Sequence, residues 1–562
     1  MSAPVHFRNV QIRQSKTSHA TARRGTALIT VLVVILLLSL AAYTFTEKMI
    51  LESEASEFAA RQAQARASAD SGVDYVAALL ADIDAASDPI NIYHDPSLFA
   101  AMPVHDPQAD RGIGMFTLVA PVVTAGSTQT VRAGLIDESG KLNVNAVLSF
   151  DLEDDEAREL FLGIPGMTEQ IADGILDWVD EDTERRQYGA EDDFYSTLSP
   201  PYTARNSPLE SLDELLLVNG MTPALLYGED ANRNGILDPN ENDGPLSLPM
   251  DNQDGQLDLG CAGYLTVYSR ESNLQSNGAE RINVNDSSLV DLYDALEEQL
   301  GEDEAQFIVA YRMYGATNVE PLDGTGLSST PDSTGDQQTD DALMDLAGRL
   351  AKALGGGNTD PIMRGGMDLS RGPRQEIDSL YELIGAEVVA EIDGSDETLA
   401  SPWQNDSGAL AGSLPLLFDV ASTIGTSTID GRINVNQARK ETLLGIPNMP
   451  SDLADAIANS PLIGPDGQAL SGQFEERQTT AWLLTRGLAD VTTMRQIDRF
   501  ITARGEVFTV QVLGHFDVKG PVARIEAVVD AVEDPPQIIA RRNLSELGPG
   551  YDLTPLVPAG GP

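Results

Sequence analysis

An acidic segment near the middle of the chain has the spacing of a calcium-binding loop. Residues 230–241 read DANRNGILDPNE, which matches the pattern D-x-[DN]-x-[DN]-G-x5-E at every specified position. In such loops positions 1, 3, 5 and 12 supply side-chain oxygens, position 7 supplies its carbonyl, and position 9 acts directly or through water. The segment therefore predicts a structural calcium ion. The predicted ligands are Asp230, Asn232, Asn234, Ile236 (through its carbonyl), Asp238 and Glu241.

A second acidic cluster follows at 251–258 and offers Asp251, Asp254 and Asp258. Its first position is out of register and no glutamate closes it, so we treat it as a weaker candidate for a second ion. Pro239 and Pro245 disfavour a long helix after the first loop, which predicts an isolated loop rather than a paired EF-hand. The alternative for both clusters is a solvated acidic loop. Ligands made only of oxygen disfavour zinc.

The composition excludes several classes of function. The chain has 87 acidic and 36 basic residues, giving a net charge of −51. Such a field repels nucleic acids, whose binding depends on lysine and arginine. Cys261 is the only cysteine, so no intrachain disulfide forms, and we expect it to be a small buried residue. No nucleophile elbow, Walker loop or H-E-x-x-H motif occurs, so we do not expect an enzyme.

The N-terminus predicts a membrane anchor. Residues 1–25 contain basic and no acidic side chains, and residues 26–45 are uncharged. At about 1.5 Å per residue that run spans a bilayer core of about 30 Å. The positive-inside rule places the leader in the cytoplasm and the rest of the chain outside. A cleaved signal peptide is the alternative, but its apolar region would be shorter. Strong helix formers continue to about residue 84, which predicts one helix over 26–84.

Three short repeats punctuate the remaining sequence. They read KLNVN at 141–145, RINVN at 281–285 and RINVN at 432–436. The first and third lead to LGIPGMTEQIADGI (162–175) and LGIPNMPSDLADAI (444–457), which predict a helix, a tight turn and a second helix. These elements resemble the helix-hairpin-helix, which in some proteins binds DNA. Because the second helix of the first copy is acidic, we expect structural hairpins, with the middle repeat as a diverged third unit.

The strand pattern completes an α+β fold. Residues 114–123, 129–137 and 504–532 alternate like strands. The simplest arrangement joins these distant segments into one antiparallel sheet packed on the N-terminal helix, with a large, mainly helical domain inserted between them. The expected segments are a leader (1–25), a transmembrane and soluble helix (26–84), first strands (85–140), helical unit 1 (141–227), acidic calcium loops (228–262), helical unit 2 (263–317), a linker-rich helical insertion (318–430), helical unit 3 (431–504), C-terminal strands (505–533) and a disordered tail (534–562).

These features together resemble type IV pilins and the pseudopilins of type II secretion. A short basic leader ending in Gly25 precedes an apolar helix that continues as a soluble one. Most such proteins have glutamate at the fifth position after the leader, where this chain has Thr30. Within the family, the absence of this carboxylate makes the chain similar to minor pseudopilin K. Three further segments are similar to that family: LIDESGKLNVN (135–145), ILDWVDEDTERRQYGAEDDFY (175–195) and RINVNQARKETLLGIP (432–447).

The resemblance implies processing, location and partners. It implies that a prepilin peptidase cleaves between Gly25 and Thr26 and that Thr26 is N-methylated. It also implies a single-pass inner-membrane protein with most of its chain in the periplasm, and calcium in the helical domain. The implied function is to initiate or cap the pseudopilus tip for export of folded proteins, with other minor pseudopilins and the major pseudopilin as partners. The alternatives are a tip minor pilin of a type IV pilus, or a membrane-anchored calcium-dependent binding protein.

Overall fold

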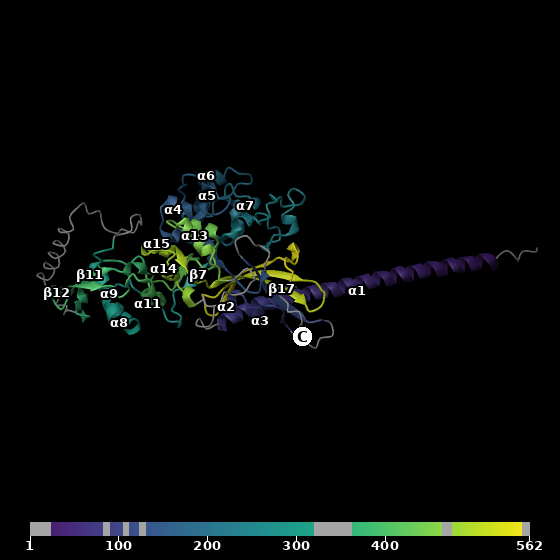
Figure 1. The fold of residues 1–562 in the computed structure, drawn as a ribbon. Coiled ribbons are helices and arrows are strands. Elements are labelled where there is room, and N and C mark those ends of the chain that lie inside the picture. The colour runs from purple at the N-terminus through teal and green to yellow at the C-terminus, as the bar shows by residue number, and fades with distance from the viewer. Residues whose placement is uncertain are drawn as a thin grey trace, which may run out of the picture. The chain divides into compact units, whose positions relative to one another are not determined.

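Helices and strands are mixed in the structure, a computed structural model that describes residues 24–82, 90–104, 112–122, 131–319, 362–462 and 475–552 (Figure 1). The chain divides into two compact units, Met1–Gln64 and Ala65–Pro562. The described part of the first unit is the beginning of one long helix, α1 (Arg24–Asp82). The expected mixed fold with a long apolar N-terminal helix is thus confirmed.

Helix α1 has the composition of a membrane-crossing helix at its start and a packed stripe near its end. Among the described residues it is the one helix long and apolar enough to span a bilayer. Further along, Ala65, Ala69, Val73 and Val76 are fully buried. Their spacing of three or four residues places them on one face of the helix. This stripe belongs to the core that α1 shares with the sheet.

That sheet joins segments from both ends of the chain. Its order is β1-β2-β17-β18-β19, with β3 paired to β2 and β4 paired to β17. Every pair is antiparallel, and Thr117 of β2 lies opposite Leu513 of β17. The expected pairing of distant strands is therefore present. The strands are β1 (Met102–Pro103), β2 (Gly114–Pro121), β3 (Val131–Arg132), β4 (Ile136–Asp137), β17 (Val507–Phe516), β18 (Ala523–Asp530) and β19 (Gln537–Asn543).

The prediction of a disordered tail over 534–562 is wrong for most of that segment. Strand β19 pairs with β18 from Gln537 to Asn543, with one bulge opposite Val528 and Val529, and Tyr551 is only 8% exposed. The β-branched pair Ile538 and Ile539 suits a strand, and the preceding Pro-Pro turn hid that signal. Residues 553–562 lie outside the described residues.

The three Asn-x-Asn repeats form the same structure three times. In each, a two-residue strand pairs in parallel with a strand that follows later in the chain. In each, the first asparagine side chain accepts a hydrogen bond from the backbone N–H of the second, at 2.9–3.0 Å. The middle repeat is therefore a third unit, as expected. The pairs are β5 (Leu142–Asn143) with β6 (Leu265–Thr266), β8 (Ile282–Asn283) with β13 (Ala421–Ser422), and β15 (Ile433–Asn434) with β16 (Ile501–Thr502).

Helix pairs follow each repeat. The first and third pairs turn at Gly166 and Asn448, both at positive φ (76° and 62°). They pack on each other where Gly163 meets Gly445, since a Cβ at either glycine would collide with backbone of the other hairpin. Their identity as helix-hairpin-helix elements stays a prediction. The pairs are α4 (Asp154–Leu162) with α5 (Glu169–Val179), α8 (Leu289–Gln299) with α9 (Glu302–Tyr314), and α12 (Lys440–Leu444) with α13 (Ser451–Ala458).

The insertion predicted as helical over 318–430 also contains strands. Its described part includes a hairpin of β11 (Glu387–Ile392) and β12 (Ser395–Ala400). Asp393 and Gly394 form its turn with positive φ at both positions, which is the geometry that Asp-Gly favours in two-residue hairpins. The prediction overlooked that dipeptide because it gave weight to the polar composition nearby. Residues 320–361 lie outside the described residues.

The remaining elements are short apart from α11. The helices are α2 (Ile90–Tyr93), α3 (Pro96–Phe99), α6 (Asp192–Tyr195), α7 (Pro223–Tyr227), α11 (Ser407–Val420), α14 (Trp482–Thr485) and α15 (Val491–Ile497). The strands are β7 (Arg270–Ser272), β9 (Met363–Arg364), β10 (Met367–Asp368) and β14 (Thr428–Asp430). The 3-10 turns are η1 (Glu138–Gly140), η2 (Val144–Phe150), η3 (Leu212–Leu217), η4 (Pro239–Glu241), η5 (Cys261–Gly263), η6 (Leu369–Arg371), η7 (Leu380–Leu383), η8 (Glu475–Arg477), η9 (Asp498–Phe500) and η10 (Ser545–Leu547).

Candidate metal-binding loop and processing site

The first acidic loop is closed by its last residue. Glu241 is 1% exposed, and its two carboxylate oxygens accept the backbone N–H groups of Ala231 (2.9 Å) and Asp238 (3.0 Å). Asp230 accepts the N–H groups of Asn234 (3.0 Å) and Gly235 (2.9 Å). The acidic residues at positions 1 and 12 therefore fold the loop around themselves.

The middle of the loop carries the remaining predicted ligands. The carboxylate of Asp238 accepts both the Asn232 amide (2.6 Å) and the Asn234 amide (3.0 Å). The side-chain oxygen of Asn232 is buried and has no hydrogen-bond partner among the described residues. Ile236 is half-buried against the sheet core, with its N–H bonded to Asn234. Asn232 thus offers an unpaired oxygen in a loop whose other predicted side-chain ligands already take part in hydrogen bonds.

The electrostatics of the loop favour a proton or a cation. The pKa of Glu241 is raised to about 6, first because its carboxylate is buried and also because Asp230 and Asp238 repel its charge. Burial likewise raises the pKa of Asp230. Across the described residues, three histidine, cysteine, aspartate or glutamate side chains nowhere gather as a ready-made metal site. In this conformation the loop carboxylates are held by backbone N–H groups instead.

The loop is fixed to the sheet through its backbone. The Arg524 guanidinium, fully buried on β18, donates to the carbonyls of Asn232 and Arg233 at 2.6 Å each. Gln511 on β17 donates to the Arg233 carbonyl (3.0 Å), and the Tyr551 hydroxyl donates to that of Asn234 (2.8 Å). The loop therefore connects the inserted domain to the sheet and to the C-terminal segment.

The second cluster does not bring its predicted ligands together. The Asp251 carboxylate caps the N–H groups of Asp243 and Gly244, while Asp254 and Asp258 are exposed and each caps a nearby N–H. The segment is instead closed by Glu229, which sequence reasoning missed. Its carboxylate accepts from Asn252 (3.2 Å) and Asp258 (3.4 Å). No sequence signal distinguished it from its many acidic neighbours.

The predicted processing site lies at the start of α1. The helix begins at Arg24, so Gly25 and Thr26 have helical backbone, but their side chains lie outside the described residues. Thr30 follows on the same helix. Cleavage between Gly25 and Thr26 and methylation of Thr26 remain predictions. Cys261, by contrast, is buried as expected, and burial raises its pKa to about 11.

Comparison with known proteins supports the resemblance to the K family. Residues 140–227 match the family model described as type II secretion system protein K. The type II secretion system protein K of Aeromonas hydrophila is 46% identical over 57 residues, and that of Klebsiella pneumoniae is 43% identical over 56. Each alignment covers 10% of this chain and 17% of the relative. These matches confirm the expected resemblance, and the family-model match covers the first helical unit.

One solved structure also aligns with most of this chain. A chain in the crystal structure of the GspK-GspI-GspJ complex from the type 2 secretion system of enterotoxigenic Escherichia coli is 10% identical. The alignment covers 88% of this chain and 99% of that chain, with a TM-score of 0.34. At that score we draw no argument from the likeness.

Proposed function

We propose that this chain is a minor pseudopilin of a type II secretion system. The observation that carries the proposal is the match of residues 140–227 to the protein K family model. That segment begins an insertion between β4 and β17 of an antiparallel sheet, on which the end of a long apolar helix packs. The role is structural: the chain would help to build a fibre for export of folded proteins and would perform no chemistry.

The proposed place of the chain is the tip of the fibre. The unit Ala65–Pro562 is large, and a domain of that size suits an end better than a position repeated along a thin fibre. Thr30 also lacks the carboxylate that an interior subunit would offer to the N-terminal amine of a neighbour. The proposed partners are other minor pseudopilins and the major pseudopilin, with the inner membrane holding α1 before assembly.

Loss of the gene tests this role. A strain lacking it should accumulate secreted proteins in the periplasm, and the wild-type gene should restore export. Loss of twitching motility with normal secretion would instead identify a type IV pilus subunit. Replacing Thr30 with glutamate should not move the protein from the tip to the shaft. Labelled protein along the fibre would contradict the tip assignment.

Processing gives a separate test. The intact mass of the chain extracted from its native membrane should lack residues 1–25 and carry one methyl group. A Gly25→Val variant should keep the leader, which controls for cleavage by other proteases. A wild-type chain that keeps its leader would contradict the pseudopilin proposal and favour a membrane-anchored binding protein.

The proposed cofactor is a structural calcium ion in the loop 230–241. The donor set is oxygen only, which suits calcium, and the unpaired Asn232 oxygen and the buried Glu241 carboxylate support it. Asp230, Asn232, Asn234, Asp238 and Glu241 would hold the ion with their side chains and Ile236 with its carbonyl. A second ion at Asp251, Asp254 and Asp258 has less support. The ion would fix the loop that joins the inserted domain to the sheet.

Thermal unfolding tests the ion. The full-length protein in detergent should melt at a higher temperature with calcium than with chelator, and magnesium should substitute poorly. Binding to the folded state adds about 2.7 kcal/mol when calcium is a hundredfold above its Kd. The double variant Asp230→Ala/Glu241→Ala should lose most of that difference. Glu297→Ala/Glu298→Ala removes the same charge from two exposed positions on α8 and should keep the calcium effect.

The calcium effect should also depend on pH. Because the pKa of Glu241 is raised to about 6, its carboxylate is protonated below that pH and an ion must displace the proton. The rise in melting temperature should therefore shrink as the pH falls from 7.5 to 5. An equal calcium effect at both pH values, or no calcium by elemental analysis, would restore the interpretation of a solvated acidic loop.

A further inference from the structure

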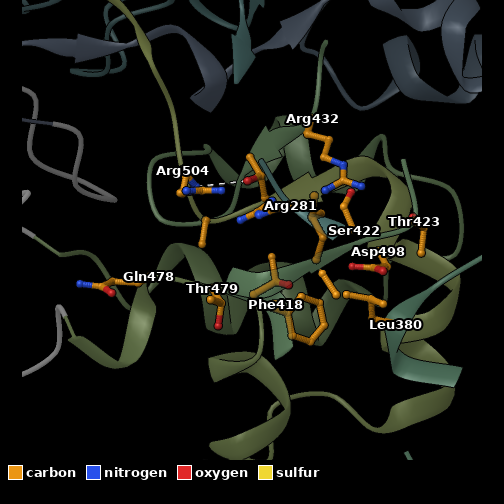
Figure 2. Close-up of a pocket in the computed structure, with 15 residues that line it drawn as sticks. Arg281, Leu380, Phe418, Ser422, Thr423, Arg432, Gln478, Thr479, Asp498 and Arg504 are labelled. Carbon is orange, nitrogen blue, oxygen red and sulfur yellow. Dashed lines mark hydrogen bonds between the residues drawn. The ribbon is translucent and has the colours of Figure 1, made fainter. Parts of the chain in front are cut away.

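Three arginines converge on one small pocket of this acidic protein. The pocket has a volume of about 50 Å³, and Arg281, Arg432 and Arg504 line it (Figure 2). A single buried water needs only about 10–15 Å³, so the space exceeds one water. Figure 2 shows the three guanidinium groups in a row, with Phe418 and Thr479 on the other side of the pocket.

The arginines come from equivalent and adjoining places in the repeats. Arg281 directly precedes β8 and Arg432 directly precedes β15, so they hold the same position in the second and third Asn-x-Asn units. Arg504 follows β16, the parallel partner of β15. The pocket therefore lies where the second and third units meet. An ion bound there would contact both units.

The first unit shows how this position is neutralised when the chain supplies its own anion. There the equivalent residue is Lys141, and its ammonium lies 2.7 Å from the Glu138 carboxylate. In the part of the chain that the structure describes, the nearest ion pair of Arg432 is long, at 3.9 Å to Glu271. Arg281 has one hydrogen bond from its Nε, at 3.2 Å to the backbone carbonyl of Asp419. The second and third units thus lack the close carboxylate of the first.

Three arginines and one acidic residue line the pocket. Asp498 is the acidic residue in the lining, and it already accepts the Ser379 hydroxyl at 2.6 Å. The pKa of Arg281 is lowered to about 10, first by burial and then by repulsion from Arg504 and Arg432, despite Glu271 and Asp419. At Arg281, burial and repulsion between the arginines therefore outweigh the attraction of Glu271 and Asp419.

Unused hydrogen-bond donors face the same space. The Nε of Arg432 and the hydroxyl of Thr479 are buried, and neither has a partner among the described residues. Buried donors without partners cost free energy, and a guanidinium fork binds oxyanions well because its N–H groups match their geometry. Ser422 and Thr480 add further hydroxyls to the lining.

We propose that this pocket binds one small tetrahedral oxyanion, phosphate or sulfate, which joins the second and third repeat units. Three guanidinium groups approaching from separate segments suit an anion with more than two acceptor oxygens. The site goes beyond the proposed secretion role and does not depend on it. The anion supplies to these two units the negative charge that Glu138 supplies to the first.

Equilibrium binding tests the site. Full-length protein in detergent and calcium-free buffer is dialysed against radiolabelled phosphate at constant ionic strength. We expect one phosphate per chain, displaced by sulfate and not by chloride. Arg281→Gln and Arg432→Gln should each weaken binding by tenfold or more. Lys141→Gln, the matched change in the first unit, should bind phosphate as the wild type does.

Melting temperature provides a second measurement. Phosphate should raise the melting temperature of wild-type and Lys141→Gln protein above its value in chloride, and this rise should disappear in the two arginine variants. Should these variants not fold, Thr479→Val, which removes only an unpaired hydroxyl, should lower phosphate affinity. Absence of bound phosphate in wild-type protein would overturn the proposal. Undiminished binding in a folded arginine variant or in Thr479→Val would overturn it as well.

Discussion

The first hairpin (α4 and α5) and the third (α12 and α13) contain corresponding ion pairs in two different environments. Arg158 and Lys440 each lie five residues before the contact glycines Gly163 and Gly445. Arg158 pairs with Asp173 at 2.7 Å, and Lys440 pairs with Asp455 at 2.5 Å. The first pair is 9% and 0% exposed, and the second is 40% and 44% exposed.

The difference arises from the segment that follows each hairpin. After α5 the chain folds back, so that the Tyr188 N–H donates to Asp173 at 2.9 Å and the Tyr188 ring lies beneath the Arg158 guanidinium. The first pair is thereby removed from water, whereas the second stays in contact with it. The comparison shows that the position in the repeat determines which residues form the ion pair. The segment that covers the pair determines how much the pair contributes to stability.

The largest expected effect is from breaking the buried pair. Arg158→Ala leaves the Asp173 carboxylate buried without its partner, so it should destabilise the protein by about 3–5 kcal/mol. Lys440→Ala, at the equivalent exposed position, should cost about 0–1 kcal/mol. Urea unfolding of both variants measures the difference. Equal losses would show that burial does not separate the two copies.

A smaller loss should follow from separating the hairpins. Gly445→Ala places a methyl group against the Leu160 carbonyl in the first hairpin, so the two copies must move apart. Overpacking of this kind costs about 1–3 kcal/mol. Gly412→Ala, at an open position on α11, is the control and should not destabilise. A neutral Gly445→Ala variant would show that the close packing is not required.

The pH dependence of stability should differ between the copies at one position. Asp177 in the first hairpin corresponds to Asn459 in the second. Burial raises the pKa of Asp177 from 3.8 to about 6, so the folded state binds the extra proton. This contribution to stability is full at low pH and is lost as the pH rises from about 4 through 6. Asp177→Asn should flatten that part of the curve, measured by melting at several pH values. An unchanged slope would show that Asp177 does not cause it.

The smallest effect concerns the hairpin turns. Asn448 has φ of 62° where the first copy has glycine, and glycine adopts this region without steric cost. Asn448→Gly should therefore raise stability by no more than about 1 kcal/mol. The reverse change, Gly166→Asn, should lower it by a similar amount. A loss of stability in Asn448→Gly would mean that the asparagine side chain itself supports the turn.

Sequence patterns predicted the parts of the fold that depend on local signals. The long helix, the strands β2, β17 and β18, and the three Asn-x-Asn units each carry a periodic or repeated pattern. Strand β19 was missed because Pro535 and Pro536 directly precede its short β-branched stretch, and its pairing with β18 is visible only in the folded chain. The acidic loop was found by spacing, but Glu229 was not, because only the folded chain brings it to Asn252. The arginine pocket was missed for the same reason, since its members are far apart in sequence.

The union of β2 and β17 in one sheet also sets an order of folding. The side chains of Thr117 and His515, which are hydrogen-bonded to each other, are 398 positions apart, and closing so long a flexible loop is entropically costly and slow. The inserted domain has a hydrophobic core of its own, so folding it first shortens the loop that remains to be closed. Strand β2 can therefore pair with β17 only after nearly the whole chain has been synthesised. A chain that stops before residue 507 leaves the apolar edge of β2 open to aggregation.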